Sequence, residues 1–283
     1  MALMPAFFVV LWATGFIGAK LGLPYASPLF FLTVRYIAAA LLLLGWVLLR
    51  GETWPRGWRV YLDLAIVGTL LHTIYLGGVF VSISMGLEAG TSALIVSLQP
   101  LLVAAVAGVL LGEQVRRLQW LGLGLGLAGV ALVVYRKAGL SSESLLAALF
   151  CVGSLLAITV AVLYQKRHLT AVPLVTGSML QFVFAAISGG LATLLFEPEA
   201  RIVWSGDFVI ALTWLVLVLS IGAVGLFLYL VRQGAASRVS SLFFLVPPCT
   251  AVMAWGLFGE QLGWVELVGM AVAGLGVALV NRA

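Results

Sequence analysis

The sequence is dominated by apolar stretches, each long enough to cross a lipid bilayer as a helix, which needs roughly 20 apolar residues. Because hydrocarbon cannot satisfy exposed backbone groups, such stretches predict a helical bundle. Ten of them are found, at about residues 3–22, 28–49, 60–85, 90–111, 118–135, 144–165, 173–196, 208–231, 237–258 and 264–281. We therefore expect an all-α integral membrane protein with ten transmembrane helices.

The composition excludes several other classes of protein. Of the 283 residues, 63% are hydrophobic and only 9% are charged, whereas about a quarter of a soluble domain is charged. The sequence has no clustered basic motif that would predict a nucleic-acid partner. Its two cysteines, Cys151 and Cys249, lie in apolar stretches without metal-ligand spacing. We expect a lipid bilayer and a small-molecule substrate as partners, with no cofactor and no metal; whether the chain is a monomer or a homodimer stays open.

The N-terminal stretch "MALMPAFFVVLWATGFIGAK" lacks a basic leader region and a cleavage site, so we interpret it as a retained first span. With the N-terminus inside, lysines and arginines outside the spans gather on the cytoplasmic side. Ten lie there, against Arg136, Lys137 and Arg201 outside; the ten are Arg50, Arg56, Arg59, Arg116, Arg117, Lys166, Arg167, Arg232, Arg238 and Arg282. Both termini are therefore predicted to be cytoplasmic.

The two halves of the chain repeat each other at an offset of 147 residues. Gly112, Glu113 and Gln114 align with Gly259, Glu260 and Gln261, and "GVALV" at 129–133 aligns with the same letters at 276–280. Five spans per half is an odd number, so the second half starts on the opposite side of the membrane. Arg116 and Arg117 follow only the first "GEQ", as the positive-inside rule requires of an inverted repeat. We predict inverted five-helix halves at 1–140 and 141–283, an arrangement common among secondary transporters.

Several segments resemble the drug/metabolite transporter superfamily, EamA type. They are "TSALIVSLQPLLVAAVAGVLLGEQVRRLQWLGLGLGLAGVALV" at 91–133, its second copy at 238–280, "LWATGFIGAK" at 11–20 and "FFLTVRYIAAALLLL" at 30–44. The resemblance implies ten helices, cytoplasmic termini and export of small metabolites across a bacterial inner membrane. In addition, "LHTIY" at 71–75 resembles the YddG-type amino-acid exporters, which implies amino acids, aromatic ones among them, as substrates.

Two cations inside spans are candidate ligands for a substrate carboxylate. A lysine or arginine at the centre of a span costs about 2.5–3.5 kcal/mol, so its presence calls for a reason. Lys20 ends the first span, where snorkelling to the outer interface is an equally good interpretation. Arg35 lies roughly 10 Å into the second span, and a structural clamp on a neighbouring helix is the interpretation we favour there.

Uncharged polar and aromatic residues at depth are the candidate substrate-binding groups. His72 and Tyr75 are three residues apart near the middle of the third span, so both project to one side. They offer hydrogen bonds and an aromatic wall, although a satisfied polar pair inside the bundle is a close alternative. Trp12 lies too deep for an interfacial belt and fits core packing equally well. We add Ser97 to these candidates.

Proline residues interrupt one span in each half. Pro100 aligns with Pro247 at the repeat offset, and Pro248 follows it. A proline frees a backbone carbonyl and lets a helix bend. We predict a hinge or gate at Pro100, Pro247 and Pro248, with an ordinary kink as the alternative.

The sequence as a whole predicts a secondary transporter that exports amino acids or similar small metabolites by alternating access. Export of a nucleotide sugar, a sugar phosphate or a cationic drug is the alternative within that class; a channel or a membrane enzyme lies outside it. We expect no enzyme and no catalytic residue, since no nucleophile–base pair is evident at depth. No carboxylate occupies a span centre and no ATP-binding motif occurs, so we favour downhill transport. His72, the only deep side chain that titrates near physiological pH, is the candidate for proton coupling.

Overall fold

The computed structural model describes residues 4–103, 142–232, 243–260 and 263–282, together with residues 106, 120–122, 124, 125, 128, 129 and 132. Within these residues the fold is helical, and extended segments meet only in an isolated bridge between Ala26 and Ile202. The first "GEQ" turn, with Arg116 and Arg117, and most of the predicted span at 118–135 lie outside the described residues.

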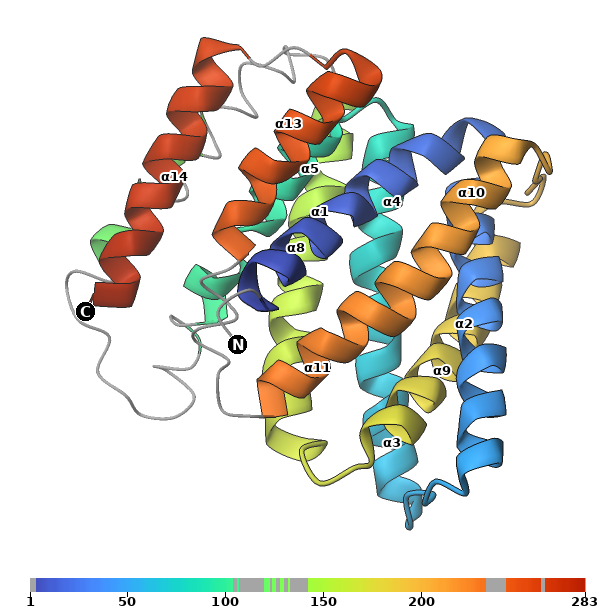
Figure 1. The fold of residues 1–283 in the computed structure, drawn as a ribbon. Coiled ribbons are helices and arrows are strands. Elements are labelled where there is room, and N and C mark those ends of the chain that lie inside the picture. Colours follow the sequence, from blue (N-terminus) through green and yellow to red (C-terminus); the bar gives the residue numbers. More distant parts are fainter. Residues whose placement is uncertain are drawn as a thin grey trace.

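The described helices follow the predicted spans, but those at 89–96 and 246–258 cover only parts of the predicted spans 90–111 and 237–258 (Figure 1). The first half contains α1 (Met4–Gly22), the 3-10 turn η1 (Leu23–Tyr25), α2 (Pro28–Arg50), α3 (Trp58–Gly68), the π-helix η2 (Thr69–Ile74), α4 (Tyr75–Ser84) and α5 (Ala89–Val96). The second half contains α8 (Ser142–His168), α9 (Leu174–Phe196), α10 (Gly206–Trp214), the π-helix η3 (Leu215–Ala223), α11 (Val224–Arg232), the 3-10 turn η4 (Phe243–Leu245), α13 (Val246–Phe258) and α14 (Trp264–Arg282). α3, η2 and α4 form one continuous span, as do α10, η3 and α11.

The outer surface of the bundle is that of a membrane protein. Six described helical segments are long and apolar enough to cross a bilayer, and two further apolar helices are shorter. Large apolar side chains such as Leu49, Leu194 and Phe196 point outward and are at least 73% exposed. A soluble protein would not expose so much apolar surface. The predicted all-α membrane fold is therefore confirmed.

Contacts between connecting segments define the two ends of the bundle. At one end, the Ser27 amide donates to the Arg201 carbonyl (3.0 Å), and Lys20 forms an ion pair with Glu260. At the opposite end, the Thr176 hydroxyl donates to the Thr53 carbonyl (3.0 Å). Segments that the sequence assigned to one side of the membrane thus lie together at one end of the fold.

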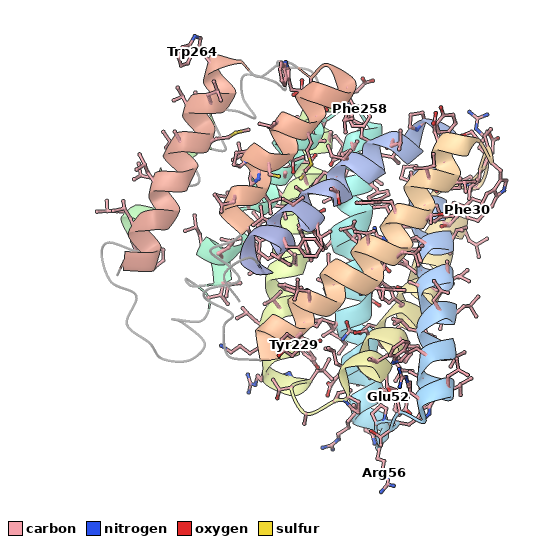
Figure 2. All side chains as sticks on the ribbon, in the orientation of Figure 1. Phe30, Glu52, Arg56, Tyr229, Phe258 and Trp264 are labelled. Atoms are coloured by element: carbon pink, nitrogen blue, oxygen red, sulfur yellow. The ribbon has the colours of Figure 1, made fainter. Side chains whose placement is uncertain are left out.

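Exposed tryptophan side chains lie at both ends of the bundle. Arg56 and Glu52 lie at the lower end in Figure 2 and Trp264 lies at the upper end. Exposed tryptophans mark both ends: Trp58 is 71% exposed at the lower one and Trp264 is 83% exposed at the upper one. Tryptophan is enriched at the two interfaces of a membrane, so these residues fit the borders of the hydrocarbon region.

α2 and α9 pack closely against each other and run antiparallel, side by side in Figure 1. The Glu197 carboxylate, at the end of α9, accepts hydrogen bonds from the Leu29 and Phe30 amides at the start of α2 (2.9 and 3.0 Å). A carboxylate suits the free amides and the positive dipole of a helix N-terminus. Adding 147 to the bounds of α2 gives 175–197, almost the bounds of α9. Equivalent helices of opposite direction are what an inverted repeat requires.

Glycines allow α3 and α4 to approach their neighbours at backbone distance. A Cβ atom on Gly78 would lie 2.7 Å from the Phe150 carbonyl oxygen of α8 and would also collide with the Ser154 hydroxyl. A Cβ atom on Gly68 would lie 2.6 Å from the Gln181 carbonyl oxygen of α9. Small residues serve this purpose in membrane bundles, where association relies on close packing. The span that carries His72 is thereby fixed against both α8 and α9.

Candidate functional site

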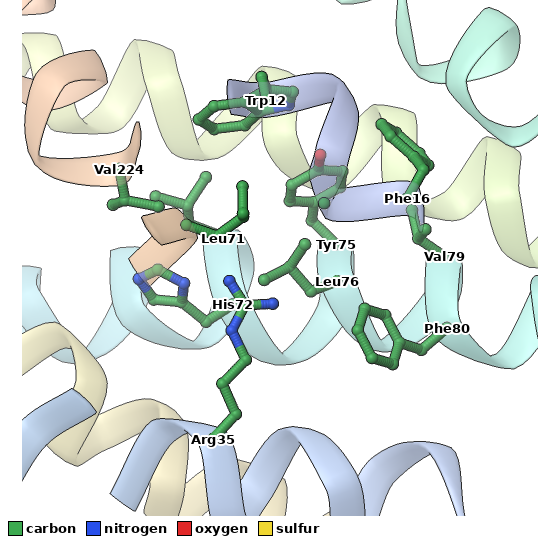
Figure 3. A pocket seen from close by; sticks show the side chains of 12 residues that line it. Trp12, Phe16, Arg35, Leu71, His72, Tyr75, Leu76, Val79, Phe80 and Val224 are labelled. Atoms are coloured by element: carbon green, nitrogen blue, oxygen red, sulfur yellow. The ribbon is translucent and has the colours of Figure 1, made fainter. Parts of the chain in front are cut away.

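A small cavity lies between the two halves, at the level of the two π-helices (Figure 3). Its volume is about 40 Å³. The first half contributes α1, α2, η2 and α4 to its walls, and the second half contributes η3 and α11. The lining residues are Trp12, Gly15, Phe16, Arg35, Leu71, His72, Tyr75, Leu76, Val79, Phe80, Leu219 and Val224. Four residues that the sequence singled out, Trp12, Arg35, His72 and Tyr75, therefore come together here.

His72 lies in η2 and is held from two sides. Its ring stacks on Phe182 of α9, with 4.4 Å between ring centroids. The Tyr36 hydroxyl of α2 donates to the His72 carbonyl oxygen (2.7 Å), and this bond satisfies a backbone acceptor of the π-helix. The side chain is only 1% exposed, yet neither ring nitrogen has a hydrogen-bond partner among the described residues. Buried polar atoms in native proteins are nearly always satisfied, so these two nitrogens are candidates for binding a ligand.

Arg35 crosses from α2 to the second π-helix. Its Nε atom donates to the Ser220 hydroxyl of η3 (2.9 Å), and the side chain is 3% exposed. Figure 3 shows its guanidinium group among the lining side chains, close to His72. Among the described residues, the guanidinium has no carboxylate within ion-pair distance. The Nε bond links α2 to η3, as the structural clamp favoured from the sequence would. The rest of the planar guanidinium group faces the cavity.

Trp12 of α1 and Tyr75 of α4 both line the cavity (Figure 3). Trp12 also packs in an aromatic cluster with Phe8, Phe227 and Phe243, at centroid distances of 5.0–5.4 Å. The Trp12 indole thus takes part in core packing and also forms part of the cavity wall. Contacts to rigid neighbours fix the position of this wall.

Lys20 lies outside this cavity. Its ammonium group forms an ion pair with Glu260, the glutamate of the second "GEQ", and lies 5.1 Å from the centre of the Phe258 ring. The Glu260 carboxylate also accepts from the Ala89 amide at the start of α5 (3.2 Å). This cluster ties the end of α1 to α13 and α5, and the side chain of Lys20 points to one end of the bundle rather than to its centre.

Ser97 and the three prolines are also separate from the cavity. The Ser97 hydroxyl donates to the Leu94 carbonyl within its own helix (2.7 Å). The helix is interrupted at residues 97–98, just before Pro100. Pro247 and Pro248 lie in the first turn of α13, after η4, where a missing amide proton costs no hydrogen bond. Both spans are therefore broken at corresponding places, and their role as hinges stays a prediction.

The sequence analysis missed Ser220, which orients Arg35, and Phe182, which supports His72. The repeat offset would have found the first of them. Thr73 plus 147 is Ser220, so hydroxyl groups occupy equivalent positions of the two π-helices. Thr73 bonds to Ser188 of α9 (2.7 Å), whereas Ser220 bonds to Arg35 of α2. Arg35 plus 147 is Phe182, so at this equivalent position the first half carries a cation and the second half an aromatic ring.

Comparison with known proteins agrees with this architecture. The profile of the EamA-like transporter family matches residues 1–135 and again residues 145–282. A solved crystal structure shares the fold with a TM-score of 0.68, covering 99% of this chain and 96% of the other, at 20% identity. The chain is 27% identical over 272 residues to the uncharacterized inner membrane transporter YedA of Escherichia coli (strain K12), covering 96% of this chain and 87% of the relative.

Two further relatives cover nearly the whole chain. One is the uncharacterized transporter YvbV of Bacillus subtilis (strain 168), 29% identical over 288 residues, which are 99% of this chain and 91% of the relative. The other is a probable amino-acid metabolite efflux pump of Salmonella typhimurium, 25% identical over 285 residues, which are 94% and 90% of the two chains. The resemblance found in the sequence is confirmed: this chain belongs to the EamA-like transporter family and is a multi-pass membrane transporter.

Proposed function

We propose that this transporter exports amino acids or similar small metabolites by alternating access between residues 1–140 and 141–283. It would reside in the bacterial inner membrane with both termini in the cytoplasm. The excess of Arg50, Arg56, Arg59, Lys166 and Arg167 at one end of the bundle supports this orientation. The similarity to an inner membrane transporter of Escherichia coli supports the location, and the similarity to a probable amino-acid metabolite efflux pump of Salmonella typhimurium supports the substrate class.

The observation that carries the proposal is the cavity between the halves. It combines Arg35 and the unpartnered nitrogens of His72 with apolar walls, the usual composition of a small-molecule site. Its volume of about 40 Å³ is far below the roughly 300 Å³ or more of an ordinary ligand pocket. The site must therefore enlarge before it admits an amino acid. A carrier that changes conformation meets this requirement, and a permanently open channel does not.

We predict that the two "GEQ" turns lie on opposite sides of the membrane. In a variant without Cys151 and Cys249, a single cysteine placed next to Arg116 should react only with a reagent added from the cytoplasmic side. A cysteine at Gly263 should react only from outside, because five spans separate the two turns. Labelling of inverted and right-side-out vesicles measures this. Both positions reacting from the same side would refute the inverted repeat.

Transport itself is tested in proteoliposomes. A panel of amino acids loaded inside should drive counterflow of the labelled amino acid, with saturation, in the absence of a pH gradient. We expect an imposed pH gradient to cause no accumulation, because a protonated His72 would be a second unpaired cation beside Arg35. Linear, non-saturating flux would indicate a channel. Uphill accumulation that requires the pH gradient and disappears in His72→Gln would overturn the downhill mechanism.

A further inference from the structure

The cavity carries one positive charge with no negative charge to balance it. Arg35 is 3% exposed, and its one hydrogen bond to the described residues joins Nε to the neutral Ser220 hydroxyl. None of the described residues that line the cavity is acidic. A buried guanidinium group without a carboxylate is energetically unfavourable. The arrangement therefore favours a ligand that supplies the missing negative charge.

The second deep cation does not change this balance. Lys20 is neutralised by Glu260 at one end of the bundle and does not line the cavity. Arg35 is therefore the cation that a ligand in the cavity would meet. Since a guanidinium group presents parallel N–H donors in a plane, the matching ligand group is a carboxylate.

His72 provides a second polar contact beside that cation (Figure 3). A neutral imidazole has one N–H donor and one acceptor, and both His72 nitrogens are unpartnered. The ring cannot turn freely, because it stacks on Phe182 and also contacts Tyr36 at a centroid distance of 5.7 Å. A carboxylate bound to Arg35 can thus receive a further hydrogen bond from a fixed donor.

Apart from the Tyr75 hydroxyl, the rest of the described lining is aliphatic or aromatic, and it offers an ammonium group no carboxylate. Trp12 and Phe16 lie opposite Arg35, and Phe80 also lines the cavity (Figure 3). The amine of an α-amino acid lies within a few ångströms of its carboxylate, so it would enter the site close to Arg35. It would lose its hydration there and find no carboxylate partner among the described lining residues. A zwitterion therefore fits this cavity less well than the corresponding anion.

Building on the proposed function, we propose that the preferred cargo is a net anion: a small carboxylate with an apolar, aromatic-sized body and no free amine. Acids related to amino acids by loss or acylation of the amine belong to this class. The anion should bind at least tenfold more tightly than a zwitterion with the same body. An amine of that body, lacking the carboxylate, should not bind at the same concentrations.

The test uses three probes that share a phenyl body: 3-phenylpropionate, phenylalanine and phenethylamine. Isothermal titration calorimetry with the purified protein in nanodiscs measures binding, and proteoliposomes measure transport. We expect 3-phenylpropionate to bind at least tenfold more tightly than phenylalanine and phenethylamine not to bind. Phenylalanine binding as tightly as 3-phenylpropionate, or no binding of 3-phenylpropionate, would overturn the inference.

Variants assign the preference to Arg35. Arg35→Gln should weaken 3-phenylpropionate binding at least tenfold and remove its advantage over phenylalanine, whereas Arg35→Lys should keep part of that advantage. The double variant Lys20→Gln with Glu260→Gln is the matched control, because it removes a deep cation outside the cavity; it should leave the preference unchanged. An Arg35→Gln protein that unfolds at the wild-type temperature but keeps the full preference would overturn the assignment.

The two proposals fail in different ways. Saturable transport of amino acids without any preference for the anion would leave the proposed function standing and refute the anion inference. Tight binding of 3-phenylpropionate to a protein that transports neither 3-phenylpropionate nor any amino acid would support the site and refute the proposed function.

Discussion

Replacing His72 by alanine is expected to reduce transport at least tenfold while the protein still inserts and folds. Neither ring nitrogen has a partner in the part of the chain that the structure describes, so the substitution removes no hydrogen bond to these residues from the side chain. The bond from the Tyr36 hydroxyl goes to the His72 backbone carbonyl and survives the change. Loss of a hydrogen bond to a ligand in a buried site costs about 1.4 kcal/mol or more, which is tenfold in affinity. Initial rates in proteoliposomes measure the effect.

The chain's other histidine provides the control. His168 is exposed at one end of α8, where it lies against Tyr164, and His168→Ala should leave transport within a factor of two of the wild type. Tyr75→Ala should impair transport as His72→Ala does, because both residues line the cavity. Unchanged kinetics in both His72→Ala and Tyr75→Ala would assign these residues to packing alone.

The largest effect on stability is expected at Gly78. A leucine there would push its Cβ atom to within 2.7 Å of the Phe150 carbonyl oxygen and into the Ser154 hydroxyl. Because a backbone atom cannot move aside as a side chain does, α4 and α8 must separate, and the displaced α4 begins with Tyr75. Overpacking of this kind costs about 2–3 kcal/mol. Thermal unfolding in detergent should show a clearly lowered Tm for Gly78→Leu, with loss of transport.

Gly45→Leu in α2 is the matched control, since a Cβ atom there has no neighbour within 4 Å among the described residues. It introduces the same leucine into a helix of the same bundle and should keep the wild-type Tm. A Gly78→Leu protein as stable as Gly45→Leu would show that α4 and α8 do not depend on this close contact.

Much of the fold could be predicted from the sequence because lipid imposes one strong rule. A chain in hydrocarbon must satisfy its backbone within each segment, so apolar length alone locates the helices. The predicted span 28–49 is α2 (Pro28–Arg50), and the predicted span 173–196 is α9 (Leu174–Phe196). The same rule explains why Arg35 and His72 stood out: a polar group at depth is costly, so it is rare and lies inside the bundle.

The partners of those groups were decided by the tertiary structure. Ser220 is 185 residues from Arg35, and Glu260 is 240 residues from Lys20; neither pair follows from spacing along the chain. From the sequence both Lys20 and Arg35 were candidate ligands for a substrate carboxylate, but packing gave Lys20 a carboxylate and left Arg35 facing a cavity.

The sequence by itself located the described helices, because their position depends on local hydrophobicity. It did not reveal the π-helices η2 and η3, since the residues Thr69–Ile74 and Leu215–Ala223 are compatible with an ordinary helix. A π turn holds an extra residue and so changes which side chains face a neighbouring helix. Which of His72, Tyr75 and Ser97 reach the cavity therefore depended on contacts between distant helices: the first two do, and Ser97 bonds within its own helix.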